Sequence, residues 1–235
     1  MPITSWSYSR LTDFEACKFR AYLKYDQKIP EPERPLPPGK SEHANDRGTR
    51  VHEGCELYVK GEIDQMPPEA EKHFGPQIDL IKHLHEEGQV SLEGEWGMDD
   101  EWNISDWRSA WFRLKLDAFV SVTDTQAVVI DYKTGKKWGN EIKHGEQLQL
   151  YAITSFLRHP DLITVDAELW YLDVNEVTRV TYEREQALRL RQKFHNRAIK
   201  LMTAKDFPPN PNIYSCRWCP YGSWGTGHCE RGVQR

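Results

Sequence analysis

An acid and a lysine follow an apolar run near the middle of the 235-residue chain. The run Val128–Ile130 leads into Asp131, Tyr132 and Lys133, and Thr-Gly comes next. This pattern predicts a buried strand that ends in a functional site. In a strand, side chains at i and i+2 share a face, so Asp131 and Lys133 should point the same way, while Tyr132 and alternate apolar residues face a core.

An acid beside a lysine has the chemistry needed to hydrolyse a phosphate ester. Asp131 would hold a divalent cation. The ammonium group of Lys133 would orient the attacking water and offset the charge that develops on the phosphoryl oxygens. On these two residues alone, an ordinary edge strand with an ion pair is the better interpretation, so a nuclease interpretation requires a further acid.

That acid is Asp117, within a second β-rich run, Leu114–Val122. Four residues, Thr123–Gln126, separate the two runs, which predicts a hairpin. A four-residue loop would place Asp117 opposite Tyr132, whereas a three-residue loop would place it opposite Asp131. A shift of one residue turns every side chain to the other face. We expect an odd-length turn or a β-bulge that brings the two carboxylates together.

Two predicted helices carry polar residues at helical spacing. Gly48 and His52 lie four residues apart in a helix that begins near Asn45 or Asp46 and ends at Gly61. A glycine on this face allows close approach of another backbone or a ligand, at a cost of about 1 kcal/mol in helix propensity. In a helix expected over 145–156, Gln147 and Tyr151 also share one face. A lone histidine is more often a surface or core residue than a metal ligand, and Gln147 with Tyr151, taken alone, is equally consistent with a surface pair.

Together and in this order, the four motifs resemble the PD-(D/E)XK nuclease superfamily in its RecB-like form. Asp117 and Asp131-Tyr132-Lys133 are similar to its strand motifs, and the two helical pairs are similar to its Gly-x-x-x-His and Gln-x-x-x-Tyr helices. The resemblance implies that a divalent cation, Mg²⁺ or Mn²⁺, is bound by His52, Asp117, Asp131 and the Tyr132 carbonyl. It also implies that Lys133 activates the water, while Gln147 and Tyr151 shape the substrate side.

The resemblance further implies an α/β fold, a restriction-endonuclease-like core with a central mixed β-sheet flanked by helices. We expect one nuclease domain over 1–235, with its core at about 45–205. Outside the hairpin, strands are expected over 90–98 and 165–172, and helices over 9–25, 69–87 and 183–202. In related nucleases an acid on the strand before Asp117 joins the site, and both Glu93 and Glu95 remain candidates.

Cysteines near both ends suggest a second metal centre. Cys216 and Cys219 form a Cys-x-x-Cys pair, Cys229 follows after nine residues, and Cys17 lies far upstream. This set resembles the iron–sulfur nucleases, including CRISPR-associated ones, which implies a [4Fe–4S] cluster. The nine-residue gap is longer than is common there, and His228 leaves Zn²⁺ open.

Such a cluster would join residues 1–29 to 206–235. A crosslink that closes nearly the whole chain can stabilise by about 5 kcal/mol through loop-closure entropy. The fifth cysteine, Cys55, is expected to be a small buried apolar residue. Unpaired burial of all five cysteines is the weaker interpretation.

Composition restricts the setting. The net charge is −5, so a nucleic-acid site would need local positive charge, for which the candidates are the basic helix over 183–202 and Lys136, Lys137 and Lys143. No run of 18 apolar residues or signal-peptide pattern occurs, which favours a cytoplasmic protein. Four tryptophans are more typical of core or hairpin packing than of base stacking: Trp96, Trp102, Trp107 and Trp111.

These observations predict a metal-dependent DNA exonuclease, stand-alone in type and either bacterial or phage-encoded. Its setting would be DNA recombination, repair or phage DNA processing, with a helicase or recombinase as a candidate partner. Two other classes stay open. One is a non-catalytic nucleic-acid-binding module held by Fe–S or Zn²⁺, against which the intact set of His52, Asp117, Asp131 and Lys133 argues. The other is a site-specific endonuclease.

Overall fold

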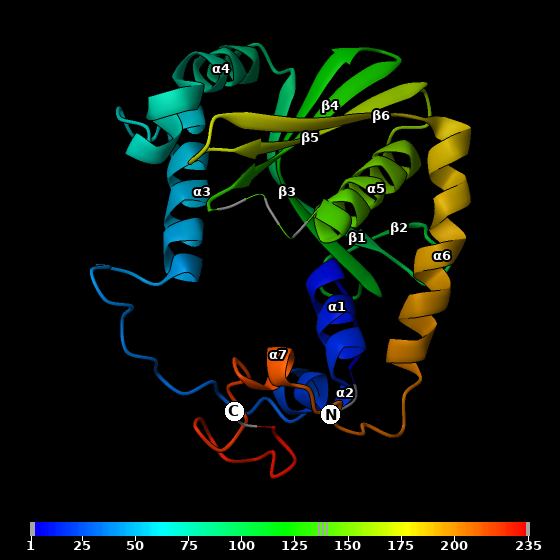
Figure 1. The fold of residues 1–235 in the computed structure, drawn as a ribbon. Helices are drawn as coiled ribbons and strands as arrows, with labels where there is room; N and C mark the ends of the chain where they lie inside the picture. Colours follow the sequence, from blue (N-terminus) through cyan, green and yellow to red (C-terminus); the bar gives the residue numbers. More distant parts are fainter. Residues whose placement is uncertain (1–2, 136, 138, 140, 234–235) are drawn as a thin grey trace.

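A six-stranded sheet forms the centre of the computed structural model (Figure 1), in the order β2-β1-β3-β4-β5-β6. The structure describes residues 3–135, 137, 139 and 141–233, and for Glu93 the backbone alone. β4 and β5 are parallel and every other neighbouring pair is antiparallel. The strands are β1 Val90–Met98, β2 Ile104–Ser105, β3 Phe112–Thr123, β4 Gln126–Lys133, β5 Thr164–Tyr171 and β6 Glu176–Glu183.

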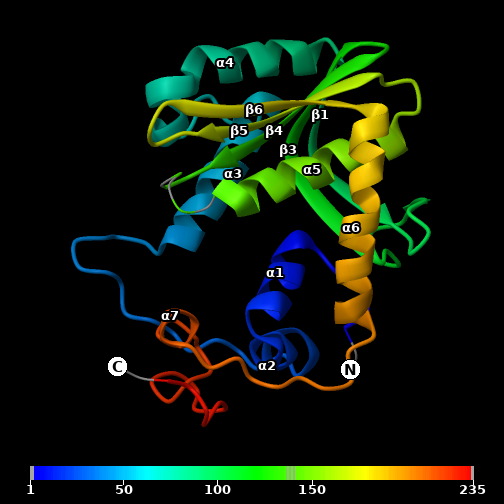
Figure 2. The same ribbon diagram turned by 45° about the vertical axis from the view of Figure 1, so that its right-hand side comes forward.

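Helices cover both faces of this sheet, which confirms the predicted α/β fold with a mixed central sheet. α3 and α4 lie on one face, and α5 and α6 on the other (Figures 1 and 2). The helical segments are α1 Tyr8–Ala16, α2 Lys18–Ala21, the π-helical η1 Tyr22–Asp26, α3 Ala44–Lys60, α4 Pro68–Glu86, α5 Glu141–Arg158, α6 Arg184–Met202 and α7 Ile213–Cys216.

The buried apolar side chains form two clusters, one beneath each of these two helix layers. One contains residues of α1, α5 and α6 together with alternate residues of the sheet, among them Val129. The other contains residues of α3 and α4 together with Ile130 and Tyr132. Tyr132 and Ile130 therefore face a core, as the alternating pattern predicts.

The path from β4 to β5 determines where the site lies. Because β4 and β5 are parallel, the chain must cross over between them, and α5 forms that crossover. Residues near the start of α5 therefore come close to Asp131 and Lys133 at the end of β4. Gly61 ends α3 in the left-handed region with φ 74°, as predicted.

Several boundaries differ from the sequence prediction. α5 begins at Glu141 rather than near Gly145, and α3 begins at Ala44, with His43 at its N-cap and no side-chain capping bond. β6 was not predicted. Its exposed edge position lets polar residues replace the apolar alternation that marks buried strands.

The predicted helix over 9–25 is wrong at Cys17. That residue is extended, with φ −161° and ψ 110°, and separates α1 from α2. Helix propensity did not reveal this break because Cys17 is positioned by contacts with the distant C-terminal segment. One of these is a hydrogen bond from the backbone N–H of Asn210 to Cys17 Sγ, 3.4 Å long.

The N-terminal segment with α2 and the C-terminal segment with α7 both lie below the sheet (Figures 1 and 2), and residues of both segments line one pocket. The Tyr221 hydroxyl donates a hydrogen bond of 3.0 Å to the Ile29 carbonyl, which links the two terminal segments. Among the residues described, no helix is both long and apolar enough to cross a membrane.

The tryptophans divide into two groups. Trp96 and Trp102 are buried in the first core cluster, and Trp111 packs against it. Trp107 lies in the loop before β3 and is only partly buried. Core packing is therefore confirmed for the first group and does not describe Trp107.

Candidate active site

The β3–β4 hairpin has the register that brings the two acids together. Ala118 pairs with Ile130, and the ladder shifts between Ser121 and Thr123. This shift adds one extra residue to β3, in agreement with the predicted odd-length turn or β-bulge. If this register is continued by one position beyond the Ala118–Ile130 pair, Asp117 lies opposite Asp131.

The Asp117 carboxylate lies where the ladder described between β3 and β4 ends. Its Oδ2 accepts a hydrogen bond of 2.5 Å from the backbone N–H of Tyr132. Its Oδ1 is 2.8 Å from Nδ1 of His52 on α3. Val51 and Cys55, which flank His52, are buried in the second core cluster and fix this helix on the sheet. Strand and helix thus hold Asp117 from two sides.

Asp131 and Lys133 are held by the first half of α5. Lys133 Nζ donates a hydrogen bond of 3.0 Å to Gln147 Oε1 and forms an ion pair with Asp131. The Tyr151 hydroxyl donates to Asp131 Oδ1 and accepts a bond of 2.6 Å from Gln147 Nε2. Since the Tyr151 side chain is fully buried, this network has little freedom to rearrange.

Burial and charge act together on these groups. Burial raises the pKa of Asp117; the hydrogen bond from His52 opposes this rise, while the charge of Asp131 adds to it. Burial alone would lower the pKa of His52, but the hydrogen bond to Asp117 and the two carboxylate charges raise it. Burial and the Asp131 charge raise the pKa of Tyr151 well above its usual range, so its hydroxyl remains a donor.

The donor set at this site suits a hard divalent cation. Carboxylate oxygens are the ligand type that Mg²⁺ and Mn²⁺ prefer, and a cation would offset the repulsion between the two acids. Asp131 Oδ2 is buried and, apart from the Lys133 ion pair, receives no hydrogen bond. Within the described ranges, no three His, Cys, Asp or Glu side chains are close enough to chelate one ion as they stand.

The sequence profile of the PD-(D/E)XK nuclease superfamily matches residues 5–224. The chain belongs to this superfamily. The matched range contains the whole sheet and every residue of the site, so nucleic acid is the substrate class and phosphodiester hydrolysis is the chemistry of the family.

Solved structures with similar folds include two with exonuclease names. The protein SSO0001 is 14% identical over 98% of this chain and 88% of its own, with a TM-score of 0.41. An exonuclease candidate from Eubacterium rectale is 11% identical over 99% and 90%, with a TM-score of 0.49. An alkaline exonuclease from Laribacter hongkongensis is 15% identical over 82% and 84%, with a TM-score of 0.39. No curated protein sequence matches this chain.

The strand register also distinguishes the two glutamates of β1. Glu95 pairs with Lys115 of β3, and their side chains form an ion pair of 2.9 Å. Leu92 pairs with Ala118, so the same register places the Glu93 backbone beside Asp117. The Glu93 side chain lies outside the described part of the structure.

One structural connection was not predicted. Arg47 of α3 donates two hydrogen bonds to Asp173, of 2.8 and 2.6 Å, and Asp173 accepts a third, of 2.7 Å, from the backbone N–H of Gly135. A Cβ atom added to Gly48 would lie 3.4 Å from the Thr134 hydroxyl, so α3 does approach the end of β4 closely. Asp173 follows β5 in a turn, and no local sequence pattern marks its partners.

Most of the predicted phosphate-binding cations have other partners. On α6, Lys193 and Arg197 both form ion pairs with Glu146, of 2.6 and 2.8 Å. Lys137 pairs with Glu176 at 2.8 Å. These contacts assign structural roles to the three residues, because their nearest anions belong to the protein. Lys136 lies outside the described residues, and Lys143 is exposed.

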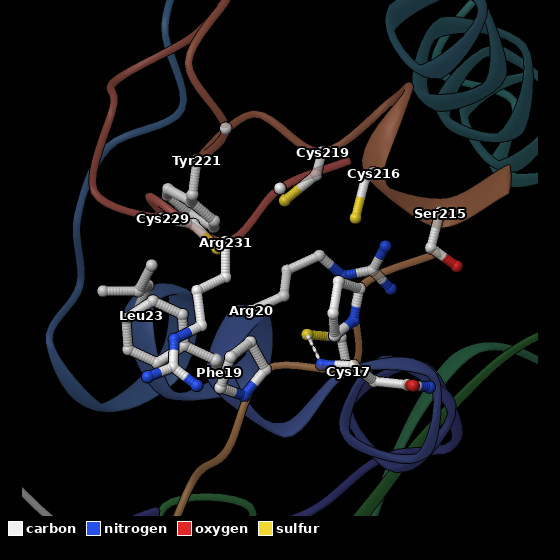
Figure 3. A pocket seen from close by; sticks show the side chains of 15 residues that line it. Cys17, Phe19, Arg20, Leu23, Ser215, Cys216, Cys219, Tyr221, Cys229 and Arg231 are labelled. Carbon is white, nitrogen blue, oxygen red and sulfur yellow. Dashed lines mark hydrogen bonds between the residues drawn. The ribbon is translucent and has the colours of Figure 1, made fainter. Parts of the chain in front are cut away.

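Four of the five cysteines line one small pocket, of about 30 Å³, near the chain ends (Figure 3). They are Cys17, Cys216, Cys219 and Cys229. The backbone N–H of Asn212 is 3.4 Å from Cys216 Sγ, and burial raises the pKa of the Cys219 thiol, as do the nearby Cys17 and Cys229. Cys55 is buried in the second core cluster, as predicted.

This pocket is not a preformed site for a single ion. Within the described ranges, no three cysteines are arranged as they would be around one Zn²⁺. His228 does not line the pocket, and its Nδ1 is 2.7 Å from the Thr226 hydroxyl.

Proposed function

We propose that this protein is a metal-dependent deoxyribonuclease that degrades DNA from an end. The observation that carries the proposal is the convergence of Asp117, Asp131 and Lys133, with Gln147 and Tyr151 bonded to the last two. Membership of the nuclease superfamily supplies the reaction class. The resemblance of the four motifs to RecB-like enzymes favours DNA as substrate and exonucleolytic cleavage.

In this proposal, the cation is held by Asp117, Asp131, His52 and the Tyr132 carbonyl, and Glu93 is the candidate for a further acid. When bound, Mg²⁺ or Mn²⁺ would lower the pKa of the attacking water and stabilise charge on the phosphoryl oxygens. The ammonium group of Lys133 lies between Asp131 and Gln147, where it would orient the water. The Tyr151 hydroxyl and Gln147 keep Asp131 and Lys133 in that arrangement.

We also propose that the four pocket cysteines bind a [4Fe–4S] cluster, with Zn²⁺ as the alternative. Support comes from the convergence of the four cysteines on one pocket. A cubane cluster binds one thiolate at each of its four irons, so four cysteines are the number of ligands that it requires. Iron and sulfide analysis of protein purified without oxygen, with its visible spectrum, would test this. Stoichiometric zinc without iron would contradict it.

The nuclease proposal is tested on end-labelled linear DNA and on circular DNA with Mg²⁺ or Mn²⁺. Intact protein should release mononucleotides or short oligomers from linear DNA and leave closed circles uncut. Lys133→Ala should abolish cleavage, because it removes the water-orienting cation while Asp117 and Asp131 remain. A matched control is Lys200→Ala on α6, which should cleave normally, since Lys200 is exposed and far from these residues in the sequence.

Other outcomes identify the alternatives. Discrete fragments from circular DNA would indicate a site-specific endonuclease. DNA binding without cleavage by intact protein, under every metal condition, would indicate a binding module. Equal cleavage by intact protein and Lys133→Ala would place the chemistry elsewhere. For a role in recombination, repair or phage DNA processing, addition of a helicase or recombinase should raise the rate on long duplex DNA.

A further inference from the structure

A second cleft lies directly beside the proposed active site. It has a volume of about 560 Å³ and is bounded by the start of α1, the start of β3 and the first turns of α5. We call it the basic cleft. Its lining includes Arg10, Trp107, Arg113, Lys115, Lys143 and Gln147. The sequence analysis did not identify it, because its cations come from three separate segments.

The charge of this cleft is the opposite of the charge of the whole chain. Two arginines, two lysines and one histidine line it, and none of the described residues in its lining is an aspartate or glutamate, in a protein of net charge −5. One of the lysines, Lys115, also pairs with Glu95. The other large surface clefts are mixed: Asp64, Glu71 and Asp79 line one, and Glu31 and Asp46 another. A concave surface of one sign concentrates ligands of the opposite sign, so the basic cleft is suited to a polyanion.

Two guanidinium groups in the cleft lack acidic partners among the described residues. Arg10 donates only to Ser5, at 2.9 Å to its carbonyl and 2.7 Å to its hydroxyl. Arg113 donates to the Arg108 carbonyl at 2.8 Å, and its buried Nε has no partner. Burial and the neighbouring Arg113 charge both lower the pKa of Arg10. Two adjacent cations without a counter-ion are suited to hold phosphate oxygens.

An aromatic ring lies next to these cations. The Arg113 guanidinium carbon is 5.4 Å from the Trp107 ring centroid, and Lys115 Nζ is 5.8 Å from it. Trp107 is the one tryptophan of the predicted four that the core does not bury or hold. A partly exposed indole beside cations is the arrangement that stacks a nucleobase while the cations hold the adjoining backbone.

The cleft leads to the reacting groups. Side chains alternate along β3, so Arg113, Lys115 and Asp117 lie on one face, within roughly 14 Å along the strand. Gln147 and Tyr151 line the cleft and also contact Lys133 and Asp131. A chain lying over Arg113 would therefore reach the two acids without turning.

We propose that the basic cleft binds one unpaired strand of nucleic acid, with backbone phosphates at Arg10, Arg113 and Lys143 and a base stacked on Trp107. This inference rests on the proposed nuclease function and names its substrate form as a single strand or an unwound end. The ring selects this form, because a base within a duplex is already stacked on both faces and cannot lie against an indole.

The experiment measures binding without chemistry. Fluorescence anisotropy of a labelled oligothymidylate and of a labelled hairpin duplex is recorded in EDTA, over a range of salt concentrations. Intact protein should bind the single strand more tightly than the duplex. Trp107→Ala should weaken single-strand binding about tenfold, and Trp107→Phe should restore most of it. Lys143→Gln should lower the slope of log K against log salt by about 0.7, as expected for one lost contact to a single strand.

Arg189→Gln on α6 is the matched charge control, because Arg189 is 75% exposed and pairs only with Glu185. It should leave both affinity and salt slope unchanged. Equal binding by Trp107→Ala and intact protein, preference for the duplex, or no binding at all would each overturn the cleft assignment. Thermal melts establish that each variant is folded. The salt slope of Lys143→Gln, a substitution at an exposed residue, keeps the proposal falsifiable if Trp107→Ala unfolds.

Failure of this inference is distinguishable from failure of the nuclease proposal. Lys133→Ala should bind the single strand as intact protein does, since Lys133 is not among the cleft cations. Cleavage that depends on Lys133, with binding that ignores Trp107, would overturn the cleft alone. Binding that depends on Trp107, in a protein that never cleaves, would overturn the nuclease and leave the cleft assignment standing.

Discussion

The sheet site and the cysteine pocket are organised in opposite ways. At the sheet site, backbone pairing between β3 and β4 brings Asp117 and Asp131 together, and each carboxylate contacts at least one protein donor. In the cysteine pocket, Cys17 meets three residues about 200 positions away, from short helices and turns. The first site is fixed by regular structure, whereas the second has little regular structure to fix it.

The sheet site and the cysteine pocket also differ in the interactions that hold their side chains in place. Repulsion between Asp117 and Asp131 destabilises the folded protein, and the hydrogen-bonded strands and helices around them offset this destabilisation. The thiols around the pocket receive only weak N–H bonds, such as those from Asn210 and Asn212. If the pocket binds the proposed cluster, its order would depend on that group, whereas protein contacts already hold the side chains of the sheet site.

The largest effect should come from removing an acid at the sheet site. Asp117→Asn keeps the size of the side chain but removes one charged ligand, so cleavage should fall about a thousandfold. Thermal stability without metal should be unchanged or higher, since burial disfavours the Asp117 charge. Rates on linear DNA and melting curves measure the two effects.

Metal dependence sharpens this test. At 100 times its dissociation constant, Mn²⁺ should stabilise intact protein by about 2.7 kcal/mol, and it should stabilise Asp117→Asn much less. If Asp117→Asn unfolds at ordinary temperature, the sheet site is not preorganised and the contrast with the cysteine pocket fails.

The second effect concerns the cysteine pocket. Cys17→Ser should lower the free energy of unfolding by about 3–5 kcal/mol, because the ends of the chain would no longer be crosslinked through a bound cluster. Iron content should fall with it, while cleavage at low temperature should persist. Denaturant unfolding of protein purified without oxygen measures the loss.

Cys55→Ala is the matched control, since Cys55 is a cysteine in the second core cluster rather than in the pocket. This substitution should lower the free energy of unfolding by about 1 kcal/mol and leave the iron content unchanged. Equal effects of the two substitutions would mean that the pocket cysteines are simply packed side chains.

The same contrast explains which parts of the structure the sequence could predict. The strand with Asp131 and Lys133 follows from local apolar alternation, and period-two geometry reduces its register against Asp117 to two alternatives. The α/β fold was expected from the family resemblance. The convergence of Cys17 with the C-terminal cysteines came from resemblance to a family, as did the roles given to His52 and Gln147.

Features that depend on distant contacts were predicted poorly. A helix was expected through Cys17, but a residue held by the far end of the chain interrupts it. The cations of α6 were candidates for phosphate binding, yet Arg197 pairs with Glu15 and Glu146. Neither partner lies near Arg197 in sequence, so charge counting alone could not distinguish a solvated basic face from a set of ion pairs.

The smallest effect should come from the Arg47–Asp173 ion pair, which links α3 to the turn after β5. Hydrogen bonds from Arg47 lower the pKa of Asp173, burial opposes the shift, and the Gly135 N–H adds to it. Asp173→Asn should therefore cost about 1 kcal/mol at neutral pH. Because the pKa is lower in the folded state, the carboxylate stabilises the protein above its unfolded pKa of about 4, and this stabilisation disappears as pH falls through the folded value.

Urea unfolding at neutral pH and at about pH 3 measures the difference between intact protein and Asp173→Asn, which should shrink toward acid. Asp161→Asn is the control, because Asp161 is exposed and forms no ion pair among the described residues, so its substitution should have little effect at either pH. A difference that grows toward acid would mean that Asp173 does not gain from Arg47. The frame that holds α3 against the end of β4 would then rest on apolar packing alone.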